Sequence, residues 1–368
     1  MTKESKYEAS GVKYDVLDPF KLACQAAARS TLGHLAAHGW TEVEHTRGES
    51  AYLVDTGDGY LAHVEEALGT KSAIADAVYK LTGRSFYRNV AIDDVSTIVN
   101  DLCTTGALPV IVGMYLAVGD TAYLADPVRC RDLAEGFAEG CRQAGAVWAG
   151  GETQVLKGLV CPEAVVLGGS AVGRIARRED RVRGDVRDGD AIICLASSGI
   201  QTNGATLCRA IAARVEGGYQ AALGDGRPFG EALLDASVIY VPFVRACQQA
   251  GVGLHYLVHL TGHGWRKLMR LDEPLVYRVE KIPTPQPVFR FIQQAERMDD
   301  EECYGTFNMG VGFAAYVSAE QADACVKAAR SAGLEAWAAG SVRKEGGRKA
   351  VEILPLGITY GAESLKIR

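Results

Sequence analysis

The sequence lacks several features that would place it in a common class of protein. Its ten cysteines form no Cys-x-x-Cys pair, so there is no zinc-binding signature. It has no run of about eighteen apolar residues, and its polar N-terminus lacks the apolar core of a signal peptide. No repeat of fixed period is visible either. We therefore expect a cytoplasmic protein with reduced cysteines and no attachment to a membrane.

Positive charge is also scarce. Lysine and arginine number 39 against 45 acidic residues, which gives a formal net charge of −6. Surfaces that bind nucleic acid are normally basic, so nucleic acid is not an expected partner. A local cationic pocket for a phosphorylated small molecule remains compatible with this charge. With 48% hydrophobic residues, the 368-residue chain predicts a globular protein with two domains.

The apolar pattern predicts strands that alternate with helices. Residues 52–54 and 60–62 should form a hairpin around a Gly-Asp-Gly turn. Helices are predicted at residues 19–38, 127–144 and 233–250. Charge density rises over residues 176–190, which is typical of a junction. We therefore predict two α+β domains, at residues 1–178 and 179–368.

Residues 92–109 form the most informative stretch. Apolar residues recur there at helical spacing, which places Asp93 near the start of a helix. Gly106 and the proline after it should end this helix before the apolar strand 110–112. Carboxylates such as Asp93 and Asp101 around one helix end suit a metal ion and a triphosphate. For Asp93 alone, a capped helix with a solvated acid is the simpler interpretation.

Two further segments follow predicted strands. Gly150-Gly151-Glu152 comes after the apolar residues 147–149, which would put Glu152 at the carboxyl end of a strand, where α/β clefts form. The alternative is a turn with a solvated glutamate. Ser197-Ser198-Gly199 follows the strand 191–196, and Asn203 begins a helix, for which an N-cap is the alternative interpretation.

Together these segments resemble the motifs of the aminoimidazole ribonucleotide synthetase (PurM) superfamily of ATP-using enzymes. The resemblance covers nearly the full chain. It is carried by residues 7–12, Gly69-Thr70-Lys71, Ile92-Asp93, Val99-Asn100-Asp101-Leu102, the run from Asp101 to Pro109, Gly150-Gly151-Glu152-Thr153, Ser197-Ser198-Gly199, Thr202-Asn203-Gly204, His259-Leu260-Thr261-Gly262 and residues 306–312.

The resemblance implies a PurM-like two-domain α+β fold. Its N-terminal domain would be mainly sheet and would pair into a homodimer, its C-terminal domain would be α/β, and ATP would lie in the cleft. A triphosphate brings about four negative charges, which Mg²⁺, lysine and backbone amides neutralise. The implied magnesium ligands are Glu66, Asp93, Asp101 and Glu152. The implied nucleotide-binding residues are Gly69, Thr70, Lys71, Asp93, Asn100, Asp101, Gly150, Gly151, Glu152, Thr153 and Asn308.

Several positions depart from the family pattern. Glu66 stands where the family has aspartate, and Gln201 stands where it has histidine. Gln201 can orient a substrate but cannot carry a proton near neutral pH. His263 replaces a glycine and could take over that role. The implied catalytic residues are therefore Lys71, Gln201, Asn203 and His263.

Two loops depart as well. Residues 45–50 replace a glycine-rich loop, and residues 154–157 replace another family segment on the substrate side. Asn308 would reach the adenine or the domain interface, while Phe307 and Met309 should be buried.

Three functions are compatible with this sequence. The first is a cyclo-ligase that phosphorylates the amide oxygen of formylglycinamidine ribonucleotide and closes the imidazole ring. The second keeps the ATP chemistry but acts on another amide or carboxylate, which the altered loop at 45–50 and Gln201 favour. The third is a non-catalytic nucleotide-binding partner subunit.

Overall fold

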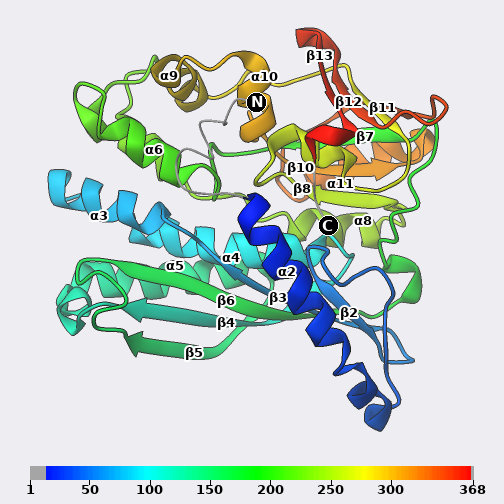
Figure 1. Cartoon of the computed structure of the whole chain (residues 1–368), viewed down its shortest axis with the longest axis horizontal. Coiled ribbons are helices and arrows are strands. Elements are labelled where there is room, and N and C mark those ends of the chain that lie inside the picture. Colours follow the sequence, from blue (N-terminus) through cyan, green and yellow to red (C-terminus); the bar gives the residue numbers. More distant parts are fainter. Residues whose placement is uncertain (1–13, 366–368) are drawn as a thin grey trace.

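The computed structural model describes residues 14–365 of the chain (Figure 1). The motif at residues 7–12 lies outside the described residues. Two sheets, each with its own helices, make up the fold, and the two-domain α+β prediction is confirmed. Among residues 14–365, no helix is both long and apolar enough to cross a membrane.

The first sheet has six strands in the order β1-β2-β3-β6-β4-β5, all of them from the chain before residue 176. Only β4 and β5 run parallel, and the predicted hairpin forms between β2 and β3. Its elements are α2 (Tyr14–Arg29), β1 (Thr41–Glu42), β2 (Tyr52–Asp55), β3 (Tyr60–Ala67), α3 (Lys71–Thr82), α4 (Tyr87–Cys103), β4 (Leu108–Val118), α5 (Pro127–Ala144), β5 (Val147–Val155) and β6 (Val165–Ile175), with 3-10 turns η1 (Leu32–His38), η2 (Thr121–Ala125) and η3 (Arg178–Asp180).

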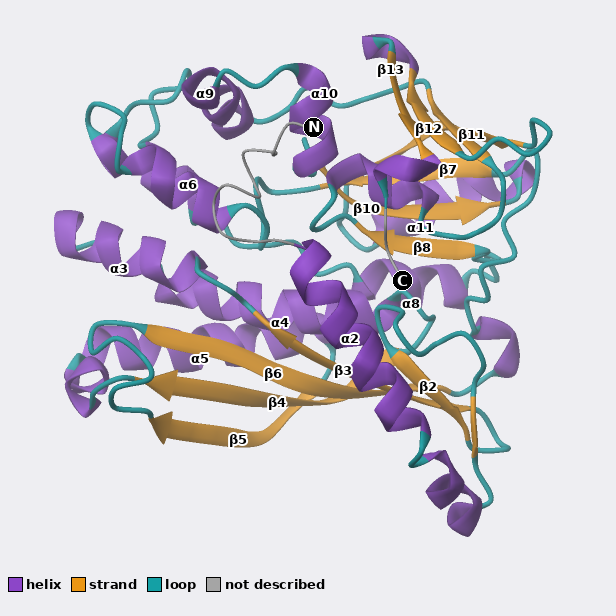
Figure 2. Cartoon of the chain, viewed as in Figure 1, coloured by secondary structure: helices purple, strands orange, loops and turns teal. Residues whose placement is uncertain are grey.

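The second sheet has seven strands in the order β13-β12-β9-β11-β7-β10-β8. Helices α8 and α11 pack together beside it, and α6, α7, α9 and α10 lie on its long connections (Figure 2). Its elements are β7 (Ala191–Ala196), α6 (Ala205–Ala212), α7 (Phe229–Leu233), α8 (Val241–Gln249), β8 (Tyr256–His259), β9 (Val276–Val279), α9 (Pro287–Glu296), α10 (Asp300–Thr306), β10 (Val311–Val317), α11 (Ala322–Ser331), β11 (Ala336–Arg343), β12 (Ala350–Ile353) and β13 (Ile358–Gly361), with 3-10 turns η4 (Gly218–Gln220), η5 (Gly264–Met269), η6 (Ala319–Gln321), η7 (Leu354–Leu356) and η8 (Ala362–Ser364).

Helix α4 lies at the centre of the molecule. It packs against strands β3, β4 and β6 and against helix α5 of the same domain. It also contacts α8, which belongs to the domain of the second sheet. Every residue from Val90 to Cys103 is buried. The prediction that Asp93 lies near a helix start is wrong, because α4 already begins at Tyr87. Asp93 therefore lies inside the helix, with no benefit from the helix N-terminus.

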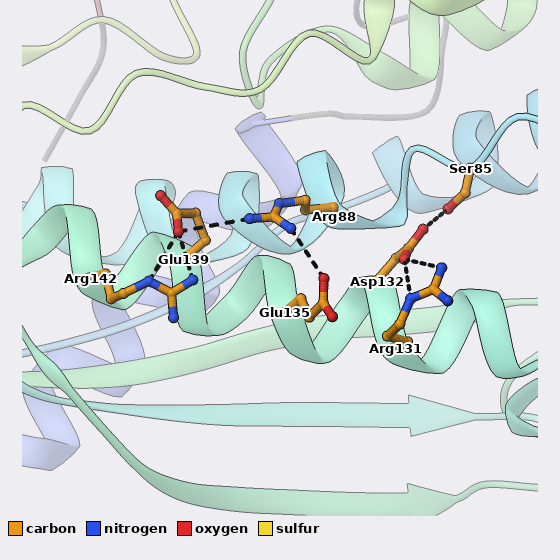
Figure 3. A network of polar contacts seen from close by, with 7 residues as sticks. All are labelled: Ser85, Arg88, Arg131, Asp132, Glu135, Glu139 and Arg142. Carbon is orange, nitrogen blue, oxygen red and sulfur yellow. Dashed lines mark hydrogen bonds and ion pairs between the residues drawn. The ribbon is translucent and has the colours of Figure 1, made fainter.

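Small residues and surface charges hold α5 against α4. A Cβ atom added to Gly136 would lie 2.2 Å from the carbonyl oxygen of Arg88, so only glycine allows this approach. On the outer surface, Arg88 pairs with Glu135 at 3.2 Å and with Glu139 at 3.8 Å (Figure 3). Because these side chains are partly exposed, each pair contributes less than about 1 kcal/mol to the free energy of unfolding. The close packing of α5 on α4 contributes more.

Three other predicted elements differ from the structure. The helix predicted at residues 19–38 already begins at Tyr14 as α2 and ends at Arg29, and residues 32–38 form the 3-10 turn η1. Strand β5 continues through Gly150 and Glu152 to Val155, because Gly150, at φ 128°, absorbs an irregularity in the pairing with β4. Glu152 is thus in mid-strand and exposed, and the prediction that it ends a strand is wrong. The predicted helix 233–250 is interrupted by an extended segment, residues 234–240, between α7 and α8.

One face of the six-stranded sheet is open. Figure 1 shows α3, α4 and α5 on one side of strands β4, β5 and β6. Several large apolar side chains of β4, β5 and β6 are more than two-fifths exposed, namely Val110, Ile111, Val147, Val155 and Val166. Contiguous apolar surface of this kind usually marks a contact with another protein.

Candidate functional site

Lys71 and Asp93 form a buried ion pair where the domain of the six-stranded sheet meets the domain of the seven-stranded sheet. Lys71 is the first residue of α3, and its Nζ lies 2.7 Å from Oδ2 of Asp93. Both side chains are fully enclosed. Lys71 also donates to the carbonyl oxygens of Gln201 at 2.9 Å and Asp235 at 3.1 Å. Burial raises the pKa of Asp93, although Lys71 and Ser237 oppose this effect.

Polar side chains of α4 hold the extended segment 234–240. Asp93 accepts from the backbone N–H and the hydroxyl of Ser237, at 2.7 and 2.5 Å. Asn100 donates to the carbonyl oxygen of Val238 and accepts from the N–H of Tyr240, both at 2.8 Å. Asp93 and Asn100, predicted to bind nucleotide, therefore join the two domains in this structure.

A second group of charges lies where β3, α4 and β8 meet. Nδ1 of His259 lies 2.6 Å from Oδ1 of Asp101, and both side chains are buried. Burial alone would raise the pKa of Asp101, but His259 and then Lys267 hold it below its ordinary value. Burial, and next the charge of Asp101, raise the pKa of Glu66 to about 7. Glu66 thus exchanges a proton near neutral pH.

Cations surround His263 beside this group. Its backbone is left-handed, with φ 71°, a conformation that the family's glycine adopts without strain. Burial, followed by the charges of Arg266 and Lys267, lowers the pKa of His263 to about 4. Lys267 is itself buried and donates to the hydroxyl of Thr261 at 2.6 Å. His263 is therefore a neutral imidazole at neutral pH.

The altered loop 45–50 lies against the same part of the molecule. Arg270, at the end of η5, pairs with Glu49 at 3.1 Å and donates to the hydroxyl of Ser50 at 3.2 Å. Arg47 of the loop pairs with Glu42 of β1, the strand that precedes the loop. The interpretation that this loop belongs to the substrate side stays a prediction, and its position next to η5 is compatible with it.

Gln201 and Asn203 are turned into the second domain. The Nε2 of Gln201 donates to the hydroxyl of Tyr240 at 3.0 Å, and only 3% of the residue is exposed. Asn203 donates to the carbonyl oxygen of Thr306 at 3.0 Å. The alternative interpretation of Asn203 as an N-cap is wrong, because Gly204 precedes α6 and Asn203 bonds elsewhere. Their catalytic roles stay predictions.

Asn308 organises the loop that follows β7. It donates to the carbonyl oxygen of Gly199 and accepts from the hydroxyl of Ser197, both at 2.9 Å. It also accepts from the N–H of Gly310. Phe307 and Met309 are buried, as predicted. Asn308 thus fixes the shape of this loop from within the domain, and a contact with adenine stays a prediction.

The four predicted magnesium ligands do not converge. Glu66 and Asp101 lie close enough to couple, Asp93 pairs with Lys71, and Glu152 lies on β5, which β6 and β4 separate from β3. Within residues 14–365, no three His, Cys, Asp or Glu side chains are grouped so that they could hold a metal ion. Gly151 and Thr153 share the exposed strand with Glu152. Gly69, at φ 74°, and Thr70 form the turn before α3.

Sequence reasoning missed three residues of these clusters. Ser237 lies in a segment that was expected to be helical, so nothing suggested a partner for Asp93. Lys267 follows a motif rather than belonging to it, and only the fold brings it next to Asp101. Asp94 is fully buried beside Asp93, which an Asp-Asp pair in a helix does not suggest.

Comparison with known families accounts for most of the chain. The profile described as AIR synthase related protein, N-terminal domain, matches residues 48–175, and its C-terminal counterpart matches residues 187–352. The chain is 32% identical over 296 residues to a phosphoribosylformylglycinamidine cyclo-ligase of Methanocaldococcus jannaschii. That alignment covers 79% of this chain and 81% of the relative.

Solved structures show the same fold at lower identity. A HypE-HypF complex chain has a TM-score of 0.60 at 15% identity, and the match covers 87% of this chain and 95% of that one. The hydrogenase maturation protein HypE in complex with ATP has a TM-score of 0.55 at 20% identity, covering 75% of this chain and 79% of that one. The fold is therefore common to proteins with different names.

Proposed function

We propose, from the premise that this chain belongs to the AIR synthase related (PurM) family, that it is a phosphoribosylformylglycinamidine cyclo-ligase. The chain is an ATP-dependent enzyme of this family. The observation that carries the specific reaction is the 32% identity over 79% of the chain to a relative with that name. The third hypothesis, a non-catalytic subunit, is therefore set aside.

In the proposed reaction, ATP phosphorylates the formyl amide oxygen of formylglycinamidine ribonucleotide. The neighbouring nitrogen then attacks the activated carbon and expels phosphate, which closes the imidazole ring and leaves ADP. An amide oxygen is a poor leaving group without this activation. The protein's share is to hold the reactants, neutralise charge and move protons.

Glu66 and Asp101 are the carboxylates that fit Mg²⁺ best. Mg²⁺ prefers one or two carboxylates together with phosphate oxygens, and these two side chains are coupled at one place. Bound Mg-ATP supplies the phosphoryl group and its neutralised charge. We propose that Lys267, beside Asp101, neutralises further phosphate charge. Lys71 and Asp93 would act mainly by fixing the domain interface.

Two further roles are assigned to Glu66 and His263. With its pKa near 7 before the metal binds, Glu66 is partly protonated at neutral pH, and coordination of Mg²⁺ would displace that proton. His263 is neutral among cations and can accept a hydrogen bond from the substrate. Gln201 contributes its carbonyl oxygen to Lys71, and its side chain holds Tyr240.

The assay is phosphate release from Mg-ATP with and without formylglycinamidine ribonucleotide. We expect substrate-dependent release that Lys267→Met reduces by at least about tenfold, the loss of one charge-assisted contact. The exposed Lys327 of α11 gives the matched control Lys327→Met, which should retain activity. Binding of ATP without substrate-dependent release would contradict the cyclo-ligase reaction and favour the second hypothesis, another amide or carboxylate acceptor.

We further propose a homodimer that pairs through the open face of the six-stranded sheet. Val147 and Val166 are 64% and 41% exposed there. Burying charge in such a contact is costly. Val147→Lys should therefore yield monomers in sedimentation analysis, whereas the wild type sediments as a dimer. The boundary between domains 1–178 and 179–368 is proposed within the segment between β6 and β7.

A further inference from the structure

A separate cavity lies in the C-terminal domain. Its volume is about 460 Å³, within the range of small-molecule sites. Helices α9 and α10, which Figure 1 shows near the top of the view, form two of its walls, and residues 282–285, Met309 and Leu356 complete it. None of the residues assigned above to ATP, magnesium or proton transfer lines this cavity.

Two opposite charges line the cavity without pairing. Arg290 of α9 has no hydrogen-bond or ion-pair partner in the described part of the chain. Asp300 of α10 accepts from Nε2 of Gln293 at 2.7 Å with one oxygen, and its second oxygen has no partner there. Both residues are exposed, so water solvates the two charges in the free protein. Both groups therefore remain available to a ligand that carries both signs.

Tyr304 adds a hydrogen-bond donor to the same wall. The residue is only 2% exposed, and its ring packs edge-on against Trp265 at 5.1 Å between centroids. Its hydroxyl has no partner within residues 14–365 and is not among the buried polar atoms that lack one, so it is open to the cavity. Burial, and next Asp300, raise the pKa of Tyr304 to about 12, so the hydroxyl keeps its proton.

The remaining lining is mixed. Thr284, Gln293 and Gln294 are polar, and the apolar part consists of Ile282, Pro283, Pro285, Met309 and Leu356. We propose that this cavity binds a free apolar α-amino acid. Its carboxylate would lie at Arg290 and Tyr304, its ammonium group at Asp300, and its side chain against the prolines and Met309. This binding site goes beyond the proposed cyclo-ligase reaction and does not depend on it.

Asp300 alone has a simpler explanation, since an acid in the first turn of α10 is favourable to the helix dipole. That explanation does not cover Arg290 and the Tyr304 hydroxyl, which face the same cavity from α9 and α10. The convergence of a cation, an anion, a neutral donor and an apolar wall on one cavity is what selects an amino acid over a simple anion.

Titration calorimetry of the full-length protein tests this proposal with four probes. Leucine and phenylalanine carry both charges, 4-methylpentanoate lacks the ammonium group, and leucinamide lacks the carboxylate. We expect at least one of the two amino acids to bind with one site per chain. Each single-charge analogue should bind at least about tenfold more weakly, the cost of one lost charged contact.

Variants locate the site. Arg290→Gln should weaken amino-acid binding about tenfold or more, whereas Arg330→Gln, an exposed arginine of α11, should leave it unchanged. Unchanged circular dichroism would establish that both variants fold. The proposal is overturned if neither amino acid binds at millimolar concentration, if the analogues bind as tightly, or if both arginine variants behave alike. The probe comparison on the wild type needs no variant.

Discussion

Asp94 provides a prediction of unusual sign. Its carboxyl group is fully buried in α4, and neither oxygen has a hydrogen-bond partner among residues 14–365. Burial, and next the charge of Asp93, raise the pKa of Asp94 well above its ordinary value of 3.8. The folded protein therefore holds a neutral acid where the unfolded chain has a solvated carboxylate at neutral pH. We expect Asp94→Asn to increase the free energy of unfolding.

The expected magnitude depends on pH. A group whose pKa is raised on folding contributes its full stability at low pH and loses it as pH rises from the unfolded toward the folded pKa. The loss is about 1.4 kcal/mol for each pH unit in that window. Asparagine has no such penalty. The gain from Asp94→Asn should thus be near zero at about pH 4 and on the order of 2–4 kcal/mol near neutral pH.

Urea unfolding followed by circular dichroism, at several pH values between about 4 and 8, measures this difference. The neighbouring variant Asp93→Asn is the matched control, because it leaves Lys71 buried without its partner. It should lower the free energy of unfolding by about 3–5 kcal/mol at neutral pH. A stability difference for Asp94→Asn that does not change with pH would refute the reasoning, since an ionising carboxyl group must produce a slope.

Two further predictions concern the interface and the proton-exchanging group. Asn100→Ala leaves the carbonyl of Val238 and the N–H of Tyr240 without partners, so it should cost about 2–4 kcal/mol in the same unfolding assay, whereas Gln249→Ala, at the exposed last position of α8, should cost less than about 1 kcal/mol. Glu66 gains its negative charge as pH rises through about 7, so kcat/KM for ATP should rise over this range in the wild type. Glu66→Gln should abolish that rise, and Glu66→Asp should retain it; a rise that persists in Glu66→Gln would assign the titration to another group.

The sequence predicted the elements whose signals are local. Helix α5 begins with a proline after its Asp126 cap and ends before Gly145, and both limits were predicted. Strand β7 was predicted with its observed limits as well. The helix predicted at 233–250 was wrong. The apolar residues there have helical spacing, but Asp93 and Asn100 of α4 hydrogen-bond residues 234–240 in an extended conformation. Local pattern cannot report such a partner.

The sequence predicted which residues of the candidate site lie together where those residues belong to a motif and are also buried. Lys71 and Asp93 do come together, and Glu66 lies near Asp101. Glu152 was misplaced because a single glycine at φ 128° lets β5 continue where the pattern suggested an end. The interpretation of Asp93 as a solvated acid was wrong for another reason. Helix α4 is covered on every side, so its polar side chains are buried and bond to neighbouring elements instead of water.

The hydrogen bonds between α4 and residues 234–240 have a consequence for folding during synthesis. The six-stranded domain leaves the ribosome first, and it already carries Asn89, Asp93 and Asn100 on α4. The segment made later gains the backbone hydrogen bonds of Leu234, Ser237, Val238 and the Tyr240 N–H from that surface, and no strand of its own domain pairs with it. The N-terminal domain thus acts as a template for the C-terminal one. Separately expressed halves should associate, and the C-terminal half alone should remain incompletely folded.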